Sequence, residues 1–298
     1  MVKIKYFVRA LRLPFVTASI LPFIFGSLIQ RANFNSLNFL FGIIAVTFTH
    51  LSANLINDYA DSKSGVDWQD KNFYKFFGGS KLIQENKLSE NFYLKSAIFF
   101  AILAFLSTIF LSLNLKAICP IIFYLFILFL AWFYSKKPFS FSYHKLGEFI
   151  IFILFGPALV MGGYFIQTKI FPDLKSFILS LPLGFLTTAI LFVNEIPDFS
   201  EDIKTNKLTW VSIVGSDKAY LIYVALISLA YLAIVFNIFL KYLNIIAINS
   251  FIFIILTVKA TWVLKTYPKD KIKLIESSKL TIMLQILISL ILIIGIIL

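Results

Sequence analysis

Long apolar runs constrain this chain more than any other feature of its sequence. A helix that crosses a bilayer needs about 20 mostly apolar residues, and we predict about nine such spans. Their approximate ranges are 14–30, 37–57, 96–114, 117–135, 148–167, 175–194, 219–239, 244–264 and 280–298. With 59% hydrophobic and 14% charged residues, the chain departs from soluble domains, which are about 45–50% apolar and about 25% charged. The sequence therefore predicts an all-α polytopic membrane protein.

The basic residues predict how these spans are oriented. If the N-terminus is cytoplasmic, 21 of the 27 Lys and Arg residues, beginning with Lys3, lie on the cytoplasmic side. The opposite side would carry only Arg31, Lys116, Lys169, Lys175 and Lys241. Cytoplasmic loops of membrane proteins are rich in Lys and Arg, so this pattern predicts a multi-pass protein of the inner (cytoplasmic) membrane. The net charge of +12 then requires no nucleic acid partner.

Two connections on the predicted cytoplasmic side are much longer than the others, and they cover 58–95 and 195–218. Long loops without a domain of their own usually carry function. Each follows an even-numbered predicted span. We therefore expect a single membrane-embedded domain over residues 1–298, with two loosely repeated halves and both loops capping a site in a central cavity. The single cysteine, Cys119, lies in an apolar run, and we expect it to be a buried thiol.

Acidic and amide side chains gather where these two loops leave their spans. In each group an asparagine precedes an aspartate by four residues, which places the pair on one face of a helix. Carboxylate and amide oxygens suit Mg²⁺, which commonly bridges one or two carboxylates to substrate phosphates. Two groups with matching spacing favour a metal site over ordinary helix caps and solvated acids. The first group holds Asn57, Asp58 and Asp61, followed by Asp67, and the second holds Asn194, Asp198 and Asp202.

The strings around these acids resemble the two motifs of the UbiA superfamily of intramembrane prenyltransferases. N-D-Y-A-D-S-K-S-G-V-D, from Asn57, resembles the first motif, and N-E-I-P-D-F-S-E-D-I-K-T-N-K-L-T, from Asn194, resembles the second. Similar strings occur at 77–81, 134–138, 146–149 and 155–168. G-V-D and N-E-I-P-D look like the branch that prenylates 1,4-dihydroxy-2-naphthoate in menaquinone synthesis. The chain departs from the family at Gly65, where many members have Asp, and at Leu208, where Arg is common.

The resemblance implies an Mg²⁺-dependent enzyme that ionises a polyprenyl diphosphate and transfers the prenyl group to an aromatic acceptor, from a site that faces the cytoplasm. It implies that Asn57, Asp58, Asp61, Asp198 and Asp202 are the Mg²⁺ ligands, and that Asp61, Asp198 and Asp202 are the catalytic carboxylates. The residues implied to contact the diphosphate or to hydrogen-bond beside it are Lys81, Lys207, Tyr134, Asn54 and Asn194. Lys259 is the only basic residue inside a predicted span, and it is either a contact for an anionic acceptor or a lysine that reaches the interface. His50 is either a site residue or a packing residue.

Two kinds of alternative stay open. The first keeps the reaction and changes the acceptor to 4-hydroxybenzoate, homogentisate, haem or a glycerol-phosphate lipid. The second is an ion-coupled transporter, which would place its acids at mid-membrane depth in broken helices. The acids of this chain come at the ends of predicted spans, below long loops, and this favours the enzyme.

Overall fold

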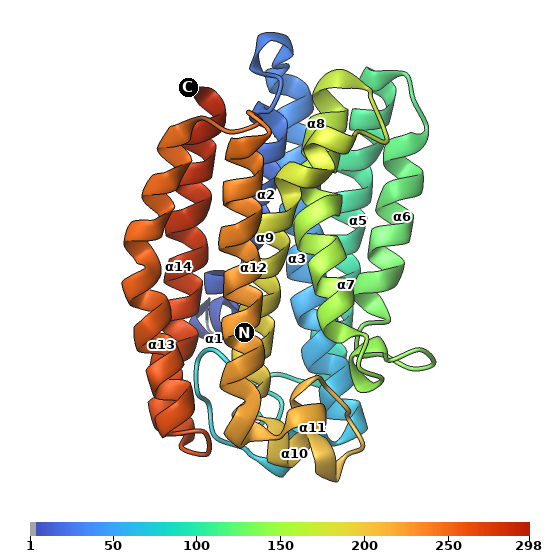
Figure 1. Cartoon of the computed structure of the whole chain (residues 1–298). Coiled ribbons are helices and arrows are strands. Elements are labelled where there is room, and N and C mark those ends of the chain that lie inside the picture. Colours follow the sequence, from blue (N-terminus) through green and yellow to red (C-terminus); the bar gives the residue numbers. More distant parts are fainter. Residues whose placement is uncertain (1–3) are drawn as a thin grey trace.

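The computed structural model describes residues 4–298, so Lys3 lies outside the described residues. Within that range the regular structure is a bundle of helices with one isolated bridge between His144 and Leu208 (Figure 1). Seven stretches are long and apolar enough to cross a membrane. They are α3 (Ser36–Ser64), α5 (Glu90–Leu115), α7 with α8 (Gly147–Thr168), α9 (Leu174–Glu195), α12 with its preceding turn (Ser216–Phe239), η6 with α13 (Ile245–Thr266) and α14 (Lys271–Ile297).

The N-terminal segment supplies an eighth candidate span. α1 (Ile4–Ala10) and the stretch Leu13–Leu28, which ends in α2 (Thr17–Leu28), meet at a bend of 40°. α6 (Cys119–Trp132) is apolar but has only 14 residues. The structure of residues 4–298 therefore supports an all-α membrane protein with seven or eight candidate spans, and the count of nine stays a prediction.

Helix ends lie several residues beyond the predicted spans, because a helix continues until its backbone is capped. The Asn35 side chain accepts the Leu37 and Asn38 N–H groups at the start of α3, and Gly65 ends the helix with a φ of 89°. Glycine adopts this left-handed conformation without strain. Asp270 caps the Ile272 and Lys273 N–H groups in the same way, so α14 begins at Lys271. Both helices thus extend into polar sequence that a hydropathy criterion leaves out.

Proline interrupts the regular helix between α7 (Gly147–Ile153) and α8 (Leu159–Thr168). Pro157 lies in a π-helical turn, Leu154–Ala158, that separates them. Proline lacks an N–H donor and cannot complete a regular α-helix at this point. Pro120 instead lies in the first turn of α6, where the missing donor is tolerated.

Close helix packing surrounds the bundle interior. α3 packs along α5, α9 (Leu174–Glu195) packs along α12 (Ala219–Phe239), and α2 packs against α8. The last pair meets at glycines: a Cβ added at Gly163 would lie 2.6 Å from the Phe23 carbonyl oxygen, and one at Gly26 would overlap the Val160 carbonyl. Small residues at such contacts are typical of membrane helices.

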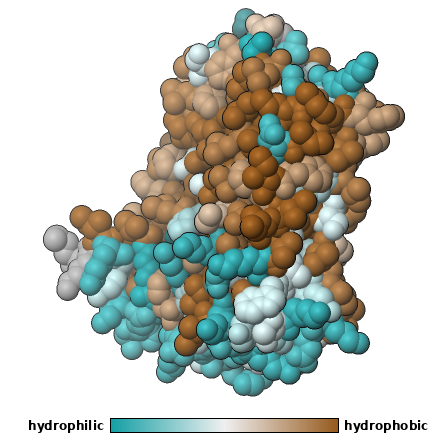
Figure 2. All heavy atoms as spheres, turned by 60° about the vertical axis from the view of Figure 1, so that its left-hand side comes forward, coloured by the Kyte–Doolittle hydropathy of each residue, from teal (hydrophilic) through white to brown (hydrophobic). Residues whose placement is uncertain are grey.

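Polar structure gathers at one end of the bundle. The short helices α4 (Val66–Gln69), α10 (Phe199–Lys204) and α11 (Val211–Val214) lie at the lower end of Figure 1, together with the loop between α4 and α5. Figure 2 shows a hydrophilic surface at this end of the bundle and a broad apolar belt above it. This division is what a bilayer imposes on a spanning protein. Which end is cytoplasmic stays a prediction.

Candidate active site

A cavity of about 360 Å³ lies inside the bundle, and its wall changes from charged to apolar. Its charged end carries side chains from α3, α4, the following loop, α9 and α10, including Asn57, Asp61, Asp67, Lys81, Asn194, Asp198, Asp202 and Lys207. The rest of the wall is mainly apolar and includes Phe23, Leu111, Phe123, Phe165 and Ile166. The predicted acidic groups of the two halves therefore meet at one end of a common cavity.

The acids of α3 face two directions. Asn57 and Asp61 are four residues apart and both line the cavity. Asn57 donates to Ser135 Oγ at 2.6 Å, and Asp61 accepts a hydrogen bond from Tyr143 at 3.0 Å. Asp58 is rotated by about 100° on the helix, and its carboxylate accepts the Ser80 N–H at 3.0 Å. Asp58, predicted as a metal ligand, thus fastens the loop beside the cavity and is absent from its wall.

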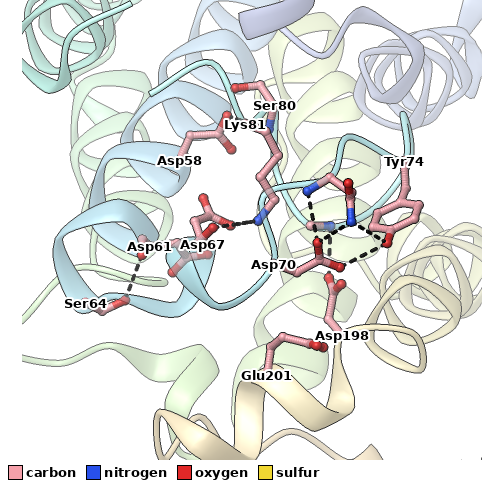
Figure 3. Close-up of polar contacts among 12 residues, drawn as sticks. Asp58, Asp61, Ser64, Asp67, Asp70, Tyr74, Ser80, Lys81, Asp198 and Glu201 are labelled. Atoms are coloured by element: carbon pink, nitrogen blue, oxygen red, sulfur yellow. Dashed lines mark hydrogen bonds and ion pairs between the residues drawn. The ribbon is translucent and has the colours of Figure 1, made fainter. Parts of the chain in front are cut away.

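The second acidic group follows the end of α9. Asp198 accepts the Gly78 N–H at 2.9 Å, which joins the two predicted loops. Figure 3 shows Asp198 and Glu201 opposite the acids of α3 and α4. Asp202 is only 1% exposed, and neither of its carboxylate oxygens has a hydrogen-bond partner. Burial raises the pKa of Asp202 to about 7, although the nearby Lys207 ammonium opposes this shift.

Two lysines lie among these acids, Lys81 buried and Lys207 partly buried. Lys207 Nζ is 3.8 Å from Asp61 Oδ2 and 3.4 Å from Asp202 Oδ1, so it stands between the two acidic groups. Burial lowers the pKa of Lys207, but Asp202 and Asp61 outweigh burial and raise it well above its ordinary value. Lys81 Nζ lies 2.9 Å from Asp67 Oδ1 (Figure 3). Burial raises the pKa of Asp67 to about 7 against the opposing charge of Lys81.

A glycine pair explains how the loop approaches so closely. Gly78 and Gly79 have φ angles of 70° and 73°, which glycine adopts far more readily than other residues. A Cβ on Gly79 would lie 3.0 Å from Asp67 Oδ2 and 3.3 Å from Asp58 Oδ1. The F-G-G-S-K string therefore presents the Gly78 and Ser80 N–H groups to Asp198 and Asp58.

The remaining predicted site residues line the same cavity, namely Tyr134, Asn54, Asn194 and His50. Burial raises the pKa of Tyr134 well above its usual value, and the carboxyl groups of Glu195 and Glu148 raise it further. Asn54 donates to the Leu11 carbonyl at 3.1 Å. The Asn194 side-chain oxygen is buried and has no hydrogen-bond partner. The wall is therefore polar well beyond the acids themselves.

The structure places Lys259 away from the cavity and favours the second of its two readings, a lysine that reaches the interface. Lys259 lies on α13 (Ile254–Thr266), its side chain is 57% exposed, and its ammonium pairs with Glu276 at 2.6 Å. It is absent from the cavity wall. The ammonium reaches a carboxylate outside the bundle interior, which satisfies its charge without any substrate.

Several residues of the charged end were not singled out from the sequence. Lys271, the first residue of α14, pairs with Asp70 at 2.8 Å and with Glu201 at 3.0 Å. Asp70 and Glu201 follow Asp67 and Asp198 by three residues, a spacing that was available as a signal. Arg12 pairs with Asp58 at 3.5 Å and lines the cavity. Sequence reasoning counted Arg12 and Lys271 only as topological charges.

The oxygen donors at the charged end suit Mg²⁺. Across residues 4–298, no three His, Cys, Asp or Glu side chains form a ready metal-binding group. Mg²⁺ does not require one, because it usually takes one or two carboxylates and completes its shell with water and substrate phosphates. Asn57, Asp61, Asp198 and Asp202 bring such oxygens to one end of the cavity. Asp202 Oδ2 has no partner and Oδ1 has only the Lys207 ammonium, 3.4 Å away, so a cation would satisfy this buried carboxylate and the residues fit the ion.

Comparison with known proteins connects this site to a family. A sequence model described as "UbiA prenyltransferase family" matches residues 19–275. The chain is 30% identical to a "UbiA prenyltransferase domain-containing protein 1" of Dictyostelium discoideum, over 64% of this chain and 58% of that protein. It therefore spans somewhat more than half the length of that relative. It is 26% identical to the "1,4-dihydroxy-2-naphthoate octaprenyltransferase" of Bacillus subtilis, over 74% of this chain and 69% of the relative.

A solved structure shows the same fold. The structure of a UbiA homolog from Archaeoglobus fulgidus bound to GPP and Mg²⁺ superposes with a TM-score of 0.64. The match covers 97% of this chain and 99% of that one, at 14% sequence identity. The arrangement of helices around the cavity is thus shared with that protein.

Proposed function

This chain belongs to the UbiA prenyltransferase family, and on that premise we propose that it is an Mg²⁺-dependent prenyltransferase. Its reaction moves a polyprenyl group from a polyprenyl diphosphate to an aromatic acceptor. The observation that carries the proposal is the cavity, which joins carboxylates and ammonium groups at one end to an apolar wall. The proposed acceptor is 1,4-dihydroxy-2-naphthoate. The G-V-D and N-E-I-P-D strings support it, and so does the name of the Bacillus subtilis relative.

The charged end suits a diphosphate. Asn57, Asp61, Asp198 and Asp202 would hold Mg²⁺, which, when bound, supplies positive charge against the diphosphate oxygens. Lys207 stands between the two acidic groups, and Lys81 is oriented by Asp67. As the carbon–oxygen bond of the substrate breaks, negative charge develops on the leaving diphosphate. Fixed ammonium groups in a buried site stabilise that charge more than water does.

The apolar wall suits the prenyl group. It holds the hydrocarbon chain and keeps water away from the allylic cation that remains when the diphosphate leaves. A ring carbon of the acceptor then donates an electron pair to the cation and forms the new carbon–carbon bond. The ring regains aromaticity when this carbon loses its former substituent, either as a proton or, from a carboxylate, as carbon dioxide, and the bonding electron pair returns to the ring. Phenylalanine rings of the wall, such as Phe155, offer faces that attract a cation at short range.

We also propose one domain of two related halves, with the charged end at the cytoplasmic side of the inner membrane. The matching spacing of Asn57 with Asp61 and of Asn194 with Asp198 supports the repeat. Contacts between the halves, such as Gly78 with Asp198, support a single unit.

An acceptor panel tests the activity. Protein purified in detergent is given Mg²⁺, a labelled polyprenyl diphosphate and 1,4-dihydroxy-2-naphthoate, 4-hydroxybenzoate or homogentisate in separate reactions. Prenylated naphthoate, formed only with Mg²⁺, is the expected result. Product with another acceptor alone would overturn the naphthoate assignment. No product with any acceptor, together with no Mg²⁺-dependent binding of the diphosphate, would overturn the enzyme assignment.

Substitution of one acid from each half tests the site. Asp61→Ala and Asp198→Ala should each lower turnover at least about 100-fold, because each removes a carboxylate that would hold Mg²⁺ beside the diphosphate. The matched control is Asp217→Ala, since Asp217 is 67% exposed and pairs with Lys269 away from the cavity. The control should keep full turnover. Full activity of either site variant, in protein that elutes as folded material, would refute the assignment.

A further inference from the structure

Two polar residues deep in the cavity wall have no role in the site described so far. Among the described residues, unpartnered buried polar atoms of the wall occur on Asn194, Glu195 and Asp202 at the charged end, and on His50 and Thr187 farther in. An unsatisfied buried polar atom costs free energy, so each such atom requires an explanation. Mg²⁺ and diphosphate account for the charged end. They do not account for His50 Nε2 and Thr187 Oγ1.

The two residues occupy matching positions in the two halves. His50 precedes Asn57 by seven residues on α3, and Thr187 precedes Asn194 by seven residues on α9. Seven residues are two helical turns, so each lies on the same helix face as its asparagine and about 10 Å farther along the helix. Both helices run toward the charged end (Figure 1). His50 and Thr187 therefore hold matching positions relative to the two asparagines, and both line the cavity.

The surroundings of His50 keep one ring nitrogen unpartnered. Nδ1 lies 2.6 Å from Ser19 Oγ, and the ring meets Phe155 edge-on with centroids 5.8 Å apart. His50 is 8% exposed and Thr187 is 4% exposed. With Nδ1 engaged, Nε2 either donates or accepts, depending on the tautomer.

Other hydroxyl groups of the wall differ from Thr187. Thr49 donates to the Ala45 carbonyl at 2.7 Å, Thr108 donates to the Ala104 carbonyl at 2.9 Å, and Tyr124 donates to the Ala101 carbonyl at 2.6 Å. These groups are satisfied by the backbone and need no ligand. His50 and Thr187 are therefore distinct in a wall that is otherwise apolar or internally bonded at this depth.

We propose that His50 and Thr187 form a subsite that binds a hydroxyl oxygen of the aromatic acceptor. A phenolic hydroxyl both donates and accepts, so it satisfies Nε2 and Oγ1 together. A carboxylate is disfavoured at this depth, because a buried charge needs a charged partner and neither residue provides a fixed one. The inference rests on the proposed prenyl transfer. It places the acceptor ring between the diphosphate end and the subsite, next to the first carbon of the prenyl group.

Kinetics of two variants tests the subsite. His50→Leu and Thr187→Val should each raise the acceptor KM about tenfold and change the KM of the prenyl diphosphate less than twofold. Thr49→Val and Thr108→Val, at satisfied hydroxyl groups of the same wall, are the matched controls and should keep both KM values. Thr187→Val should also keep the melting temperature, because the lost hydroxyl has no partner. If the acceptor KM is unchanged in both variants, the subsite is refuted.

A binding measurement separates this inference from the proposed reaction. Binding of 1-naphthol and 1-methylnaphthalene is compared at one detergent concentration, without any prenyl substrate. The wild-type protein should prefer 1-naphthol about tenfold, and both subsite variants should lose most of that preference. An equal preference in wild type and variants refutes the subsite even where the acceptor panel yields product. Failure of the panel with the preference intact refutes the transfer reaction and leaves a subsite for aromatic hydroxyl groups.

Discussion

Single residues decide which acids reach the cavity. Gly65 occupies the position where many family members have aspartate, and here its φ of 89° ends α3. An aspartate would be strained in that conformation. The next acid, Asp67, lies in α4, is 5% exposed and pairs with Lys81. The departure seen in the motif thus has a local reason, since this chain uses the position to turn its backbone and uses Asp67 to orient a lysine.

The change in the stability of the fold between pH 4 and pH 2 depends on Asp70. Partial burial raises the pKa of Asp70, but hydrogen bonds from Lys271 and the Asn72 N–H outweigh it and lower the pKa to about 2. A carboxyl whose folded pKa lies below its unfolded value contributes stability above about pH 4. That contribution is lost as the pH falls toward 2.

Asp70→Asn should therefore unfold less steeply between pH 4 and pH 2 than the wild type, and should be less stable at pH 7 by about 1–2 kcal/mol. Tryptophan fluorescence during acid titration in detergent measures both effects. Asp217→Asn, at the exposed pair with Lys269, is the control and should follow the wild type. Identical unfolding curves between pH 4 and pH 2 for Asp70→Asn and the wild type would contradict the expectation.

At the scale of elements, the bundle depends on where helices touch without side chains between them. Gly163 of α8 faces α2, and a Cβ there would meet the Phe23 carbonyl oxygen at 2.6 Å and the Ser27 nitrogen at 2.8 Å. Its neighbour Gly162 has no atom within 4 Å of the same added Cβ. Of these adjacent glycines, therefore, Gly163 has no room for a side chain and Gly162 has room for one.

Gly163→Ala should lower stability by about 1–3 kcal/mol, because backbone atoms of α2 must move to admit the methyl group. Gly162→Ala is the matched control and should be neutral or slightly stabilising, since alanine favours the helix more than glycine does. Thermal unfolding of both variants in the same detergent provides the comparison. Equal melting temperatures for the two variants would show that α2 and α8 are not in close contact.

At the scale of the whole molecule, polar contacts tie the two halves together at the charged end. Lys207 reaches Asp61 across the halves, and Gly78 donates to Asp198. Lys271 from the last helix joins Asp70 to Glu201. These residues are far apart in sequence, and their meeting closes the polar end of the cavity while the apolar belt stays in the bilayer (Figure 2).

The single cysteine offers a test of orientation. Cys119, expected from the sequence to be buried, is exposed at the start of α6, on the side opposite the charged end. If the charged end is cytoplasmic, a membrane-impermeant maleimide should label Cys119 in intact bacterial cells. In a Cys119→Ala background, Lys218→Cys should be labelled only after the membrane is permeabilised. The reverse pattern would place the site outside the cell.

Much of the site was predictable because its parts are local. Asn57 and Asp61 share a face through helical spacing alone. The glycine pair beside Lys81 indicates that the backbone approaches another group closely. Asp58 stays a predicted metal ligand, but spacing does not say how a helix is rotated toward its neighbours, and the structure turns Asp58 toward the Ser80 N–H. Lys259 was considered as an acceptor contact because its depth in a span was readable, whereas its pairing with Glu276 was not.

The sequence by itself determined that this protein lies in a bilayer, and it indicated the chemistry of the site. Runs of about 20 apolar residues require a bilayer, and two acidic motifs of equal spacing point to a metal and a diphosphate. Only the tertiary structure decided which side chains share the cavity, because helix rotation and loop closure depend on packing between segments far apart in the chain. That packing brings Lys207 between Asp61 and Asp202. It also leaves His50 and Thr187 unpartnered in one wall, and no local pattern encodes that juxtaposition.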